Sequence, residues 1–140
     1  MCKLLGYDKL FPMNSGVEAT ETAVKLARKW AYNVKGVPDD QAVILLPTGT
    51  YWGRSITAGG ACTDPLRYTG FGPFTGGFDF VEFNNLEDLE AKIKANKNIA
   101  GFLIECIQGE AGVIIPDDGY ISKAYKLCKD NNVLFMADEV

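Results

Sequence analysis

The sequence predicts an α/β protein with a mostly parallel sheet and flanking helices. Apolar runs of strand length, such as residues 42–46 and 99–107, alternate with segments of helical periodicity. The last apolar run, residues 133–140, does not alternate and ends in carboxylates, which is typical of a parallel strand buried on both faces. No repeat or linker interrupts this order, so we expect a single domain over residues 1–140.

Composition narrows the class of protein. The chain has 140 residues, 47% of them hydrophobic, with a formal net charge of −4. The length permits a sizeable core, and the excess of acids argues against a general binder of nucleic acid or anionic membranes. No segment approaches the ~18 consecutive apolar residues of a membrane helix. We therefore expect neither nucleic acid nor a membrane as a partner, although a local anion site remains possible.

Histidine is absent, and this removes Ser-His-Asp and Cys-His catalysis and every histidine-containing metal site within the chain. The four cysteines show no C-x-x-C spacing. We expect Cys106 and Cys128 to be buried, reduced thiols of an intracellular protein.

The first half begins with the clearest helix. Ser15 and Glu18 form an S-x-x-E capping box, and Gly36 with Pro38 closes the helix. A strand is expected at residues 42–46, followed by a short helical turn and a long ordered loop within residues 55–78. The apolar stripe of the helix consists of Val17, Ala23, Val24, Ala27, Trp30, Ala31 and Val34, and the aromatics expected to pack the loop are Tyr68, Phe71, Phe74 and Phe78.

The second half continues the alternation. A strand is predicted at residues 80–83, and Asn85 is expected to cap a helix over residues 86–95. The strand at residues 99–107 is interrupted late by Glu105, a turn follows at residues 109–112, and residues 119–131 have helical spacing. The run 133–140 is the last strand.

A small-residue turn, Ser15-Gly16-Val17, opens the first helix, where free backbone N–H groups and the helix dipole favour an anion such as phosphate. The turn lacks a nucleotide-binding fingerprint, so a plain capped helix remains the alternative. Glu18 and Glu21 would repel an anion unless their carboxylates point elsewhere.

Further candidate residues follow the strands. Tyr51 could stack on a planar ligand or pack in the core, and Arg54 could bind a carboxylate or form a surface ion pair. Glu105, Glu110 and Asp138 could act as bases, metal ligands or partners of a cationic ring, or be solvated acids at strand ends. Without histidine we expect no metal site.

Four motifs in order, residues 13–23, 51–54, 104–113 and 137–140, resemble the class III pyridoxal-phosphate aminotransferases. The likeness covers essentially the whole chain, and residues 25–30 and 68–74 favour the ornithine-type members of the family. The resemblance implies that residues 1–140 are part of the pyridoxal-phosphate-binding large domain of the type I aminotransferase fold, in an enzyme that is a homodimer when intact.

The resemblance also implies roles for individual residues. Ser15, Gly16 and Val17 would hold the cofactor phosphate, Tyr51 would stack on the pyridine ring in a place where the family commonly has Phe, and Asp138 would pair with the ring nitrogen. Substrate contacts would come from Arg54, near the substrate carboxylate, and from Glu110, which would pair with an arginine further along the chain. Glu105 would be a supporting carboxylate near the site.

The implied activity is transfer of the δ-amino group of ornithine to 2-oxoglutarate, giving glutamate semialdehyde and glutamate. Other possibilities are a class III enzyme for acetylornithine or an ω-amino acid, and an inactive binding module. Cys106 departs from the family's usual proline, and the lysine that carries the cofactor would lie after Val140. We therefore expect no turnover by the purified 140 residues. Because the cysteines are expected to be reduced, we also expect an intracellular location, in the cytoplasm or alternatively in the mitochondrial matrix.

Overall fold

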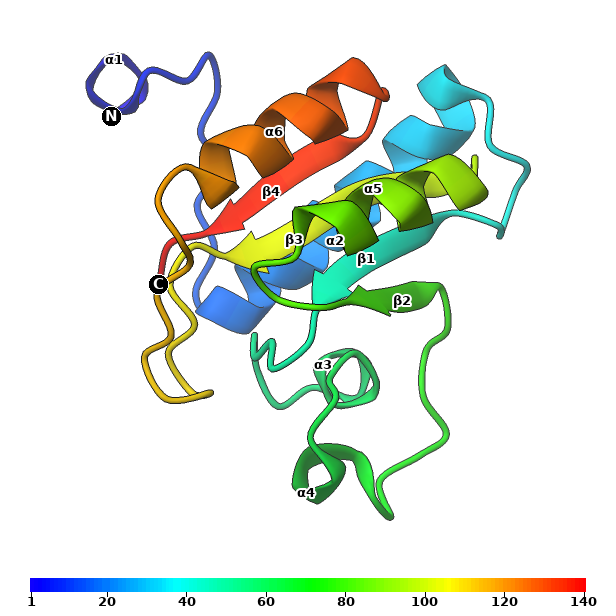
Figure 1. Ribbon diagram of the computed structural model, residues 1–140. Helices are drawn as coiled ribbons and strands as arrows, with labels where there is room; N and C mark the ends of the chain where they lie inside the picture. The colour runs from blue at the N-terminus through cyan, green and yellow to red at the C-terminus, as the bar shows by residue number, and fades with distance from the viewer.

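The computed structural model describes residues 1–140 as a parallel sheet between two layers of helices (Figure 1). The strand order is β2-β1-β3-β4, and every neighbouring pair is parallel. The predicted α/β class is confirmed. The strands are β1 (Val43–Pro47), β2 (Phe78–Val81), β3 (Ile99–Glu105) and β4 (Leu134–Asp138).

Two apolar clusters lie on opposite faces of the sheet. Helices α2 (Gly16–Trp30) and α3 (Ile56–Gly60) cover one face, whereas α5 (Leu86–Ala95) and α6 (Tyr120–Asp130) cover the other. Because side chains alternate along a strand, Ile44 of β1 joins the α2 cluster and Leu45 joins the α5 and α6 cluster. Both side chains are fully buried, so β1 is a central strand covered on both faces.

The start of α2 agrees with the predicted capping box. The Ser15 Oγ accepts a hydrogen bond from the Glu18 N–H at 3.4 Å. The Glu18 carboxylate reaches back one residue further than in the usual box, because it accepts from the Asn14 N–H at 3.1 Å. Both ends of this turn are therefore tied by side chains.

The predicted end of the same helix was only partly right. After Trp30 the chain continues as a π-helical segment, η1 (Ala31–Lys35), before Gly36 ends it at a φ of 84°. A π turn contains more residues than an α turn, so the apolar stripe loses its phase. Ala31 is fully buried, but Val34 is 70% exposed and does not belong to the buried stripe.

The α5 helix has the predicted bounds, and its cap is the predicted one: the Asn85 side chain accepts from the Asp88 N–H at 3.0 Å. The predicted strand at residues 80–83 lies two residues too late. Strand β2 begins at Phe78, directly after Gly77, and Phe78 is in register with Ile44 of β1.

Strand β4 corrects the expectation of burial on both faces. Within the chain it pairs only with β3 and forms an edge of the sheet. Residues 134–136 are half-buried and Ala137 is exposed. The long apolar run correctly predicted a strand. The run alone did not show how much of that strand the other elements of this chain bury.

Two short helices, α3 and α4 (Pro65–Tyr68), lie where one helical turn was expected, and an irregular segment then leads to β2. Its aromatic residues pack unequally. Phe74 lies so close to Gly60 that a Cβ on that glycine would be 2.5 Å from the Phe74 Cβ, whereas Phe71 is 60% exposed. The segment is thus packed through Phe74 and Phe78 rather than through all its aromatics.

At the amino end, α1 (Cys2–Leu5) is a single turn. No helix is both long and apolar enough to cross a membrane. All four cysteines are free thiols. Cys128 is buried as predicted, but Cys106 is only half-buried because it follows the end of β3.

A close contact joins the turn after β1 to the start of α2. Gly53 adopts a φ of 140°, and a Cβ at this position would lie 2.5 Å from the Val17 Cγ2. Only a glycine combines this backbone conformation with such a close approach. The contact fixes the aromatic turn against the amino end of the helix.

Replacing Gly53 with Ala should therefore destabilise the protein by about 1–3 kcal/mol, because the added methyl must displace Val17. Gly76→Ala is the matched control, since a Cβ there meets no atom within 4 Å. Chemical denaturation of both variants measures the difference. Equal stability of the two variants would show that the contact is not tight.

Candidate functional site

The carboxyl ends of β1, β3 and β4 and the amino end of α2 enclose a pocket of about 330 Å³. Its wall contains six of the eight residues that the sequence singled out. In open α/β sheets this edge is where ligands bind. The six are Gly16, Val17, Tyr51, Glu105, Glu110 and Asp138.

The amino end of α2 presents free donors to this pocket. The N–H groups of Gly16 and Val17 precede the first intrahelical hydrogen bond, which the Ala19 N–H makes to the Ser15 carbonyl. Thr20, which the sequence indicated only as a small residue of the buried helix stripe, also lines the pocket, and its hydroxyl donates to the Gly16 carbonyl at 3.1 Å. Ser15 itself is outside the wall of this pocket, and its hydroxyl donates to Glu18.

The two acids that could repel an anion are engaged elsewhere. Glu18 folds back on Asn14 and Ser15, and Glu21 accepts a hydrogen bond from the Ser55 hydroxyl at 2.7 Å. Neither carboxylate lines the pocket. The amino end of α2 therefore keeps its positive character toward the pocket.

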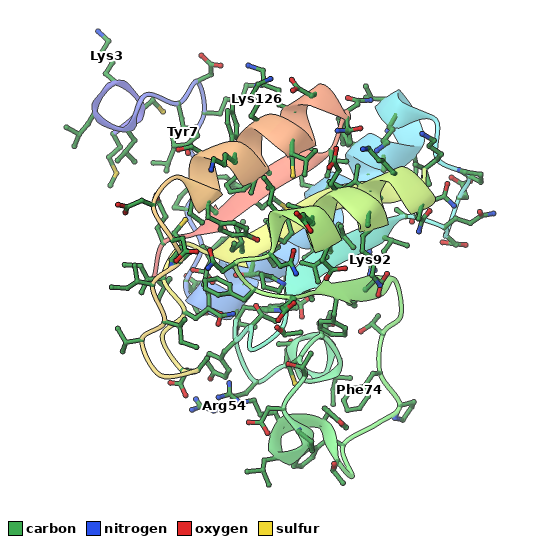
Figure 2. The ribbon with its side chains drawn as sticks, viewed as in Figure 1. Lys3, Tyr7, Arg54, Phe74, Lys92 and Lys126 are labelled. Carbon is green, nitrogen blue, oxygen red and sulfur yellow. The ribbon has the colours of Figure 1, made fainter.

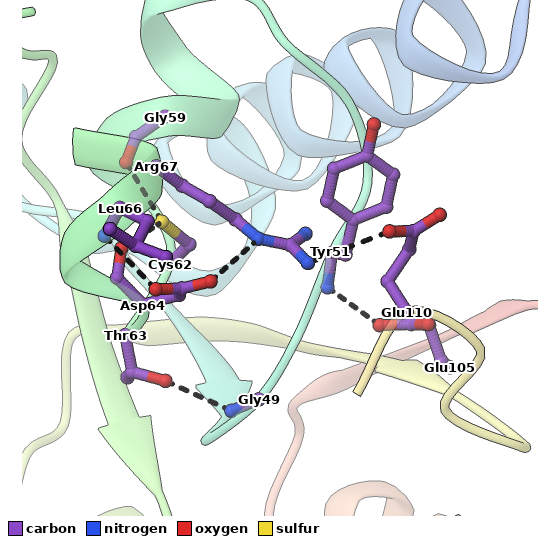
Figure 3. A network of polar contacts seen from close by, with 10 residues as sticks. All are labelled: Gly49, Tyr51, Gly59, Cys62, Thr63, Asp64, Leu66, Arg67, Glu105 and Glu110. Atoms are coloured by element: carbon purple, nitrogen blue, oxygen red, sulfur yellow. Dashed lines mark hydrogen bonds and ion pairs between the residues drawn. The ribbon is translucent and has the colours of Figure 1, made fainter. Parts of the chain in front are cut away.

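Glu105, the last residue of β3, joins two loops of the site, and Figure 3 shows its contact with Tyr51 in the first of them. Its Oε1 accepts from the Tyr51 N–H at 2.7 Å, and its Oε2 accepts from the Gly109 N–H at 3.1 Å. Burial raises the pKa of this carboxyl above its ordinary value, and the nearby Asp138 carboxylate adds to the increase. The two backbone hydrogen bonds oppose the increase because they favour the charged form.

Asp138 ends β4 in register with Glu105. Parallel pairing therefore places the two carboxylates side by side at the same edge of the sheet. One Asp138 oxygen, Oδ1, accepts from the Val140 N–H at 3.1 Å. That bond fixes the side chain at the pocket wall.

A second pocket of about 470 Å³ lies beside α3 and α4 and shares the residues Tyr51, Trp52, Gly53 and Glu110 with the first. Arg54 lines the second pocket and not the first, and its guanidinium lies 5.9 Å from the centre of the Tyr51 ring. Figure 2 shows the Arg54 side chain exposed beside these short helices. Of the eight predicted residues, Ser15 and Arg54 are the two outside the first pocket.

Sequence reasoning missed Arg67, whose side chain projects from α4 toward Tyr51 and Glu110 (Figure 3). Its Nη2 lies 3.6 Å from a Glu110 oxygen, and the guanidinium lies 4.4 Å from the centre of the Tyr51 ring. Its position in a glycine- and proline-rich segment gave no signal, because the contacts form only when the chain folds. A second missed residue, Gln108, is 1% exposed and donates to the Thr48 carbonyl at 2.8 Å, which ties the ends of β1 and β3 together.

Comparison with known proteins supports the motif resemblance. The model of the family described as aminotransferase class-III matches residues 1–140. The chain belongs to the class III aminotransferases.

Individual members of the family are also similar. A Caenorhabditis elegans protein named probable ornithine aminotransferase, mitochondrial, is 56% identical over 138 residues, which is 99% of this chain and 32% of the relative. A crystallised ornithine aminotransferase of Toxoplasma gondii, described with partial occupancy of PLP at its active site, superposes with a TM-score of 0.98 at 46% identity over 100% of this chain and 33% of its own. An acetylornithine aminotransferase of Elizabethkingia anophelis gives a TM-score of 0.79 at 43% identity over 99% of this chain and 30% of its own.

This class III chain spans about a third of the length of the relatives it matches. All residues of the pocket described above lie within this third of the relatives' length. The similarity to the Toxoplasma structure extends over all the elements that build the pocket.

In this class III chain, Glu105→Gln should reduce stability by about 1–3 kcal/mol, because an amide has only one oxygen for two backbone donors. Since the folded state raises the pKa of Glu105, it binds more protons than the unfolded chain between the ordinary value of 4.5 and the raised one. The wild type should therefore gain stability relative to Glu105→Gln as the pH falls from neutral through this window.

Denaturation at several pH values measures this difference. Glu87→Gln, in the exposed first turn of α5, is the control and should change stability little at any pH. A difference between wild type and Glu105→Gln that does not depend on pH would contradict the assignment.

Proposed function

We propose that residues 1–140 form part of the pyridoxal-phosphate-binding large domain of an aminotransferase. In the complete enzyme, the proposed reaction is transfer of the δ-amino group of ornithine to 2-oxoglutarate, which yields glutamate semialdehyde and glutamate. The two similar ornithine aminotransferases named above support the choice of substrate. An expected homodimer follows from the family resemblance alone.

The observation that carries the proposal is the convergence of three kinds of group on one pocket. A pyridoxal phosphate presents a dianionic phosphate, a flat aromatic ring and a basic ring nitrogen. The free N–H groups of Gly16 and Val17, the ring of Tyr51 and the carboxylate of Asp138 match these three parts in turn. The residues present therefore fit this cofactor.

When bound, the cofactor supplies an electron sink for the carbanion that forms as the amino acid loses a proton. In the proposal, Asp138 holds a proton on the ring nitrogen by its negative charge. Tyr51 would stack on the ring and fix its orientation, and the start of α2 would hold the phosphate with Ser15 as a supporting residue. Arg54 would lie near a substrate carboxylate, and Glu110 would pair with an arginine further along the chain and so help the site to admit either ornithine or 2-oxoglutarate.

We propose an intracellular location. The cytoplasm and the mitochondrial matrix both suit a chain with four free thiols. The Caenorhabditis elegans relative carries the word mitochondrial in its name, and this supports the matrix. Targeted imaging of a tagged full-length protein would decide between the two.

A second candidate is an acetylornithine aminotransferase. The similarity to the Elizabethkingia enzyme at 43% identity favours it as the next choice. Both candidates need the same cofactor pocket, so they differ only in the amino donor.

The test is a titration of pyridoxal phosphate into the longest natural protein that carries this sequence, followed by absorbance spectroscopy, borohydride reduction and peptide mapping. We expect a bound chromophore that is trapped on a lysine after Val140 and that is bleached by ornithine. Bleaching by acetylornithine alone would select the second candidate. Failure to bind or trap the cofactor would refute the aminotransferase proposal.

In the same protein, Asp138→Asn should still bind the cofactor but lower kcat/KM by about two orders of magnitude, because the amide cannot hold a positive ring nitrogen. Asp130→Asn is the control, because Asp130 is exposed on α6 and pairs only with Lys126. Steady-state kinetics with ornithine measures both variants. An Asp138→Asn variant with wild-type kinetics would exclude the proposed pairing.

A further inference from the structure

Arg67 of α4 contacts Asp64, the N-cap of its own helix, and two side chains from other parts of the chain, Tyr51 and Glu110. Its Nε binds the Asp64 carboxylate at 3.1 Å, and its Nη2 lies 3.6 Å from Glu110 Oε2. The guanidinium carbon Cζ lies over the Tyr51 ring, 4.4 Å from the ring centre. At this distance a guanidinium is attracted to the face of an aromatic ring.

The two pockets show from which side Arg67 approaches the ring. Tyr51 lines both pockets, whereas Arg67 lines only the pocket beside α3 and α4, and Asp138 lines only the pocket at the sheet edge. Arg67 therefore contacts Tyr51 from the pocket beside α3 and α4. The pocket at the sheet edge, which Tyr51 also lines, does not contain Arg67 and is left to a ligand.

The burial of Arg67 indicates a defined position. Its side chain is 27% exposed, but its Nη1 is buried and has no hydrogen-bond partner. Leaving a buried donor unpaired costs free energy, so other contacts must stabilise the guanidinium in this position. The contacts with Tyr51, Asp64 and Glu110 fulfil that role.

We propose that Arg67 is a positioning residue of the cofactor site. It holds the Tyr51 ring at the angle needed to stack on the pyridine of the cofactor, and it restrains the Glu110 carboxylate at the shared wall of the two pockets. This inference rests on the proposed function. It links α4, which contributes no residue to the cofactor pocket, to the affinity for the cofactor.

The test compares Arg67→Gln and Arg67→Lys with the wild type in the longest natural protein that carries this sequence. The dissociation constant of pyridoxal phosphate is measured by absorbance titration, and stability is measured by thermal denaturation. Arg67→Gln should weaken cofactor binding by about 2- to 30-fold, the range expected for a lost cation–π contact. Arg67→Lys should recover part of the loss, because it keeps the charge without the plane.

Arg28→Gln is the matched control. Arg28 also lies over an aromatic ring, with its guanidinium 5.0 Å from the centre of Phe78, and it donates to the Gly76 carbonyl at 2.7 Å. Arg28 lines neither pocket. Arg28→Gln should lower the melting temperature and leave the dissociation constant of the cofactor unchanged.

A double-mutant cycle with Tyr51→Leu shows whether Arg67 acts through the ring. If it does, Arg67→Gln should weaken binding much less in the Tyr51→Leu background than in the wild type. An equal loss in both backgrounds would overturn the inference, as would an Arg67→Gln variant that binds the cofactor like the wild type. If the wild type itself binds no cofactor, the proposed function is refuted, and this inference is refuted with it. The same double-mutant cycle measured by melting temperature then tests only the Arg67–Tyr51 contact.

Discussion

The hydrogen bonds of Glu105 hold the candidate site in one piece. The turn after β1 and the turn after β3 both leave the sheet at the same edge, where the Gln108 hydrogen bond to the Thr48 carbonyl already joins them near the sheet. A single carboxylate accepts a backbone N–H from each turn and so fixes the distance between Tyr51 and Gly109. Because the carboxylate is half-buried, these bonds act in a medium less polar than water and are stronger for it.

Charge is distributed in the site by the directions of the chain elements. The helix α2 points its amino end at the pocket, and β3 and β4 deliver Glu105 and Asp138 to the same pocket. The positive end of the helix dipole and the two acids therefore contribute fields of opposite sign within one pocket. A small ligand with an anionic group at one end and a basic nitrogen at the other would be oriented by this field before any specific contact forms.

The sequence was sufficient for the parts of the fold that depend on local patterns. Capping residues located the starts of α2 and α5, because a cap acts within three residues of its position. The π segment at Ala31–Lys35 escaped prediction, since periodicity assumes a constant number of residues per turn. The extent of burial of β4 also escaped, because burial depends on neighbours and not on the strand's own composition.

The candidate site divides in the same way. Residues that follow strands or open a helix could be placed from the order of elements, and six of them reached one pocket. Arg54 lines the neighbouring pocket instead. The sequence could not predict this, because the spacing of residues does not determine the direction of a side chain. Arg67 could not be found at all from the sequence, since its partners Tyr51 and Glu110 are brought to it only by the tertiary fold.

The edge position of β4 has a consequence for how the chain behaves at high concentration. One side of this strand bonds to β3, and the other presents unpaired backbone groups beside the half-buried Phe135 and Met136. The other edge strand, β2, has only four residues. Pairing of strands with a second polypeptide, including amyloid-like stacking, would therefore begin at β4. A charged residue introduced at the exposed Ala137 should oppose this aggregation of the 140 residues.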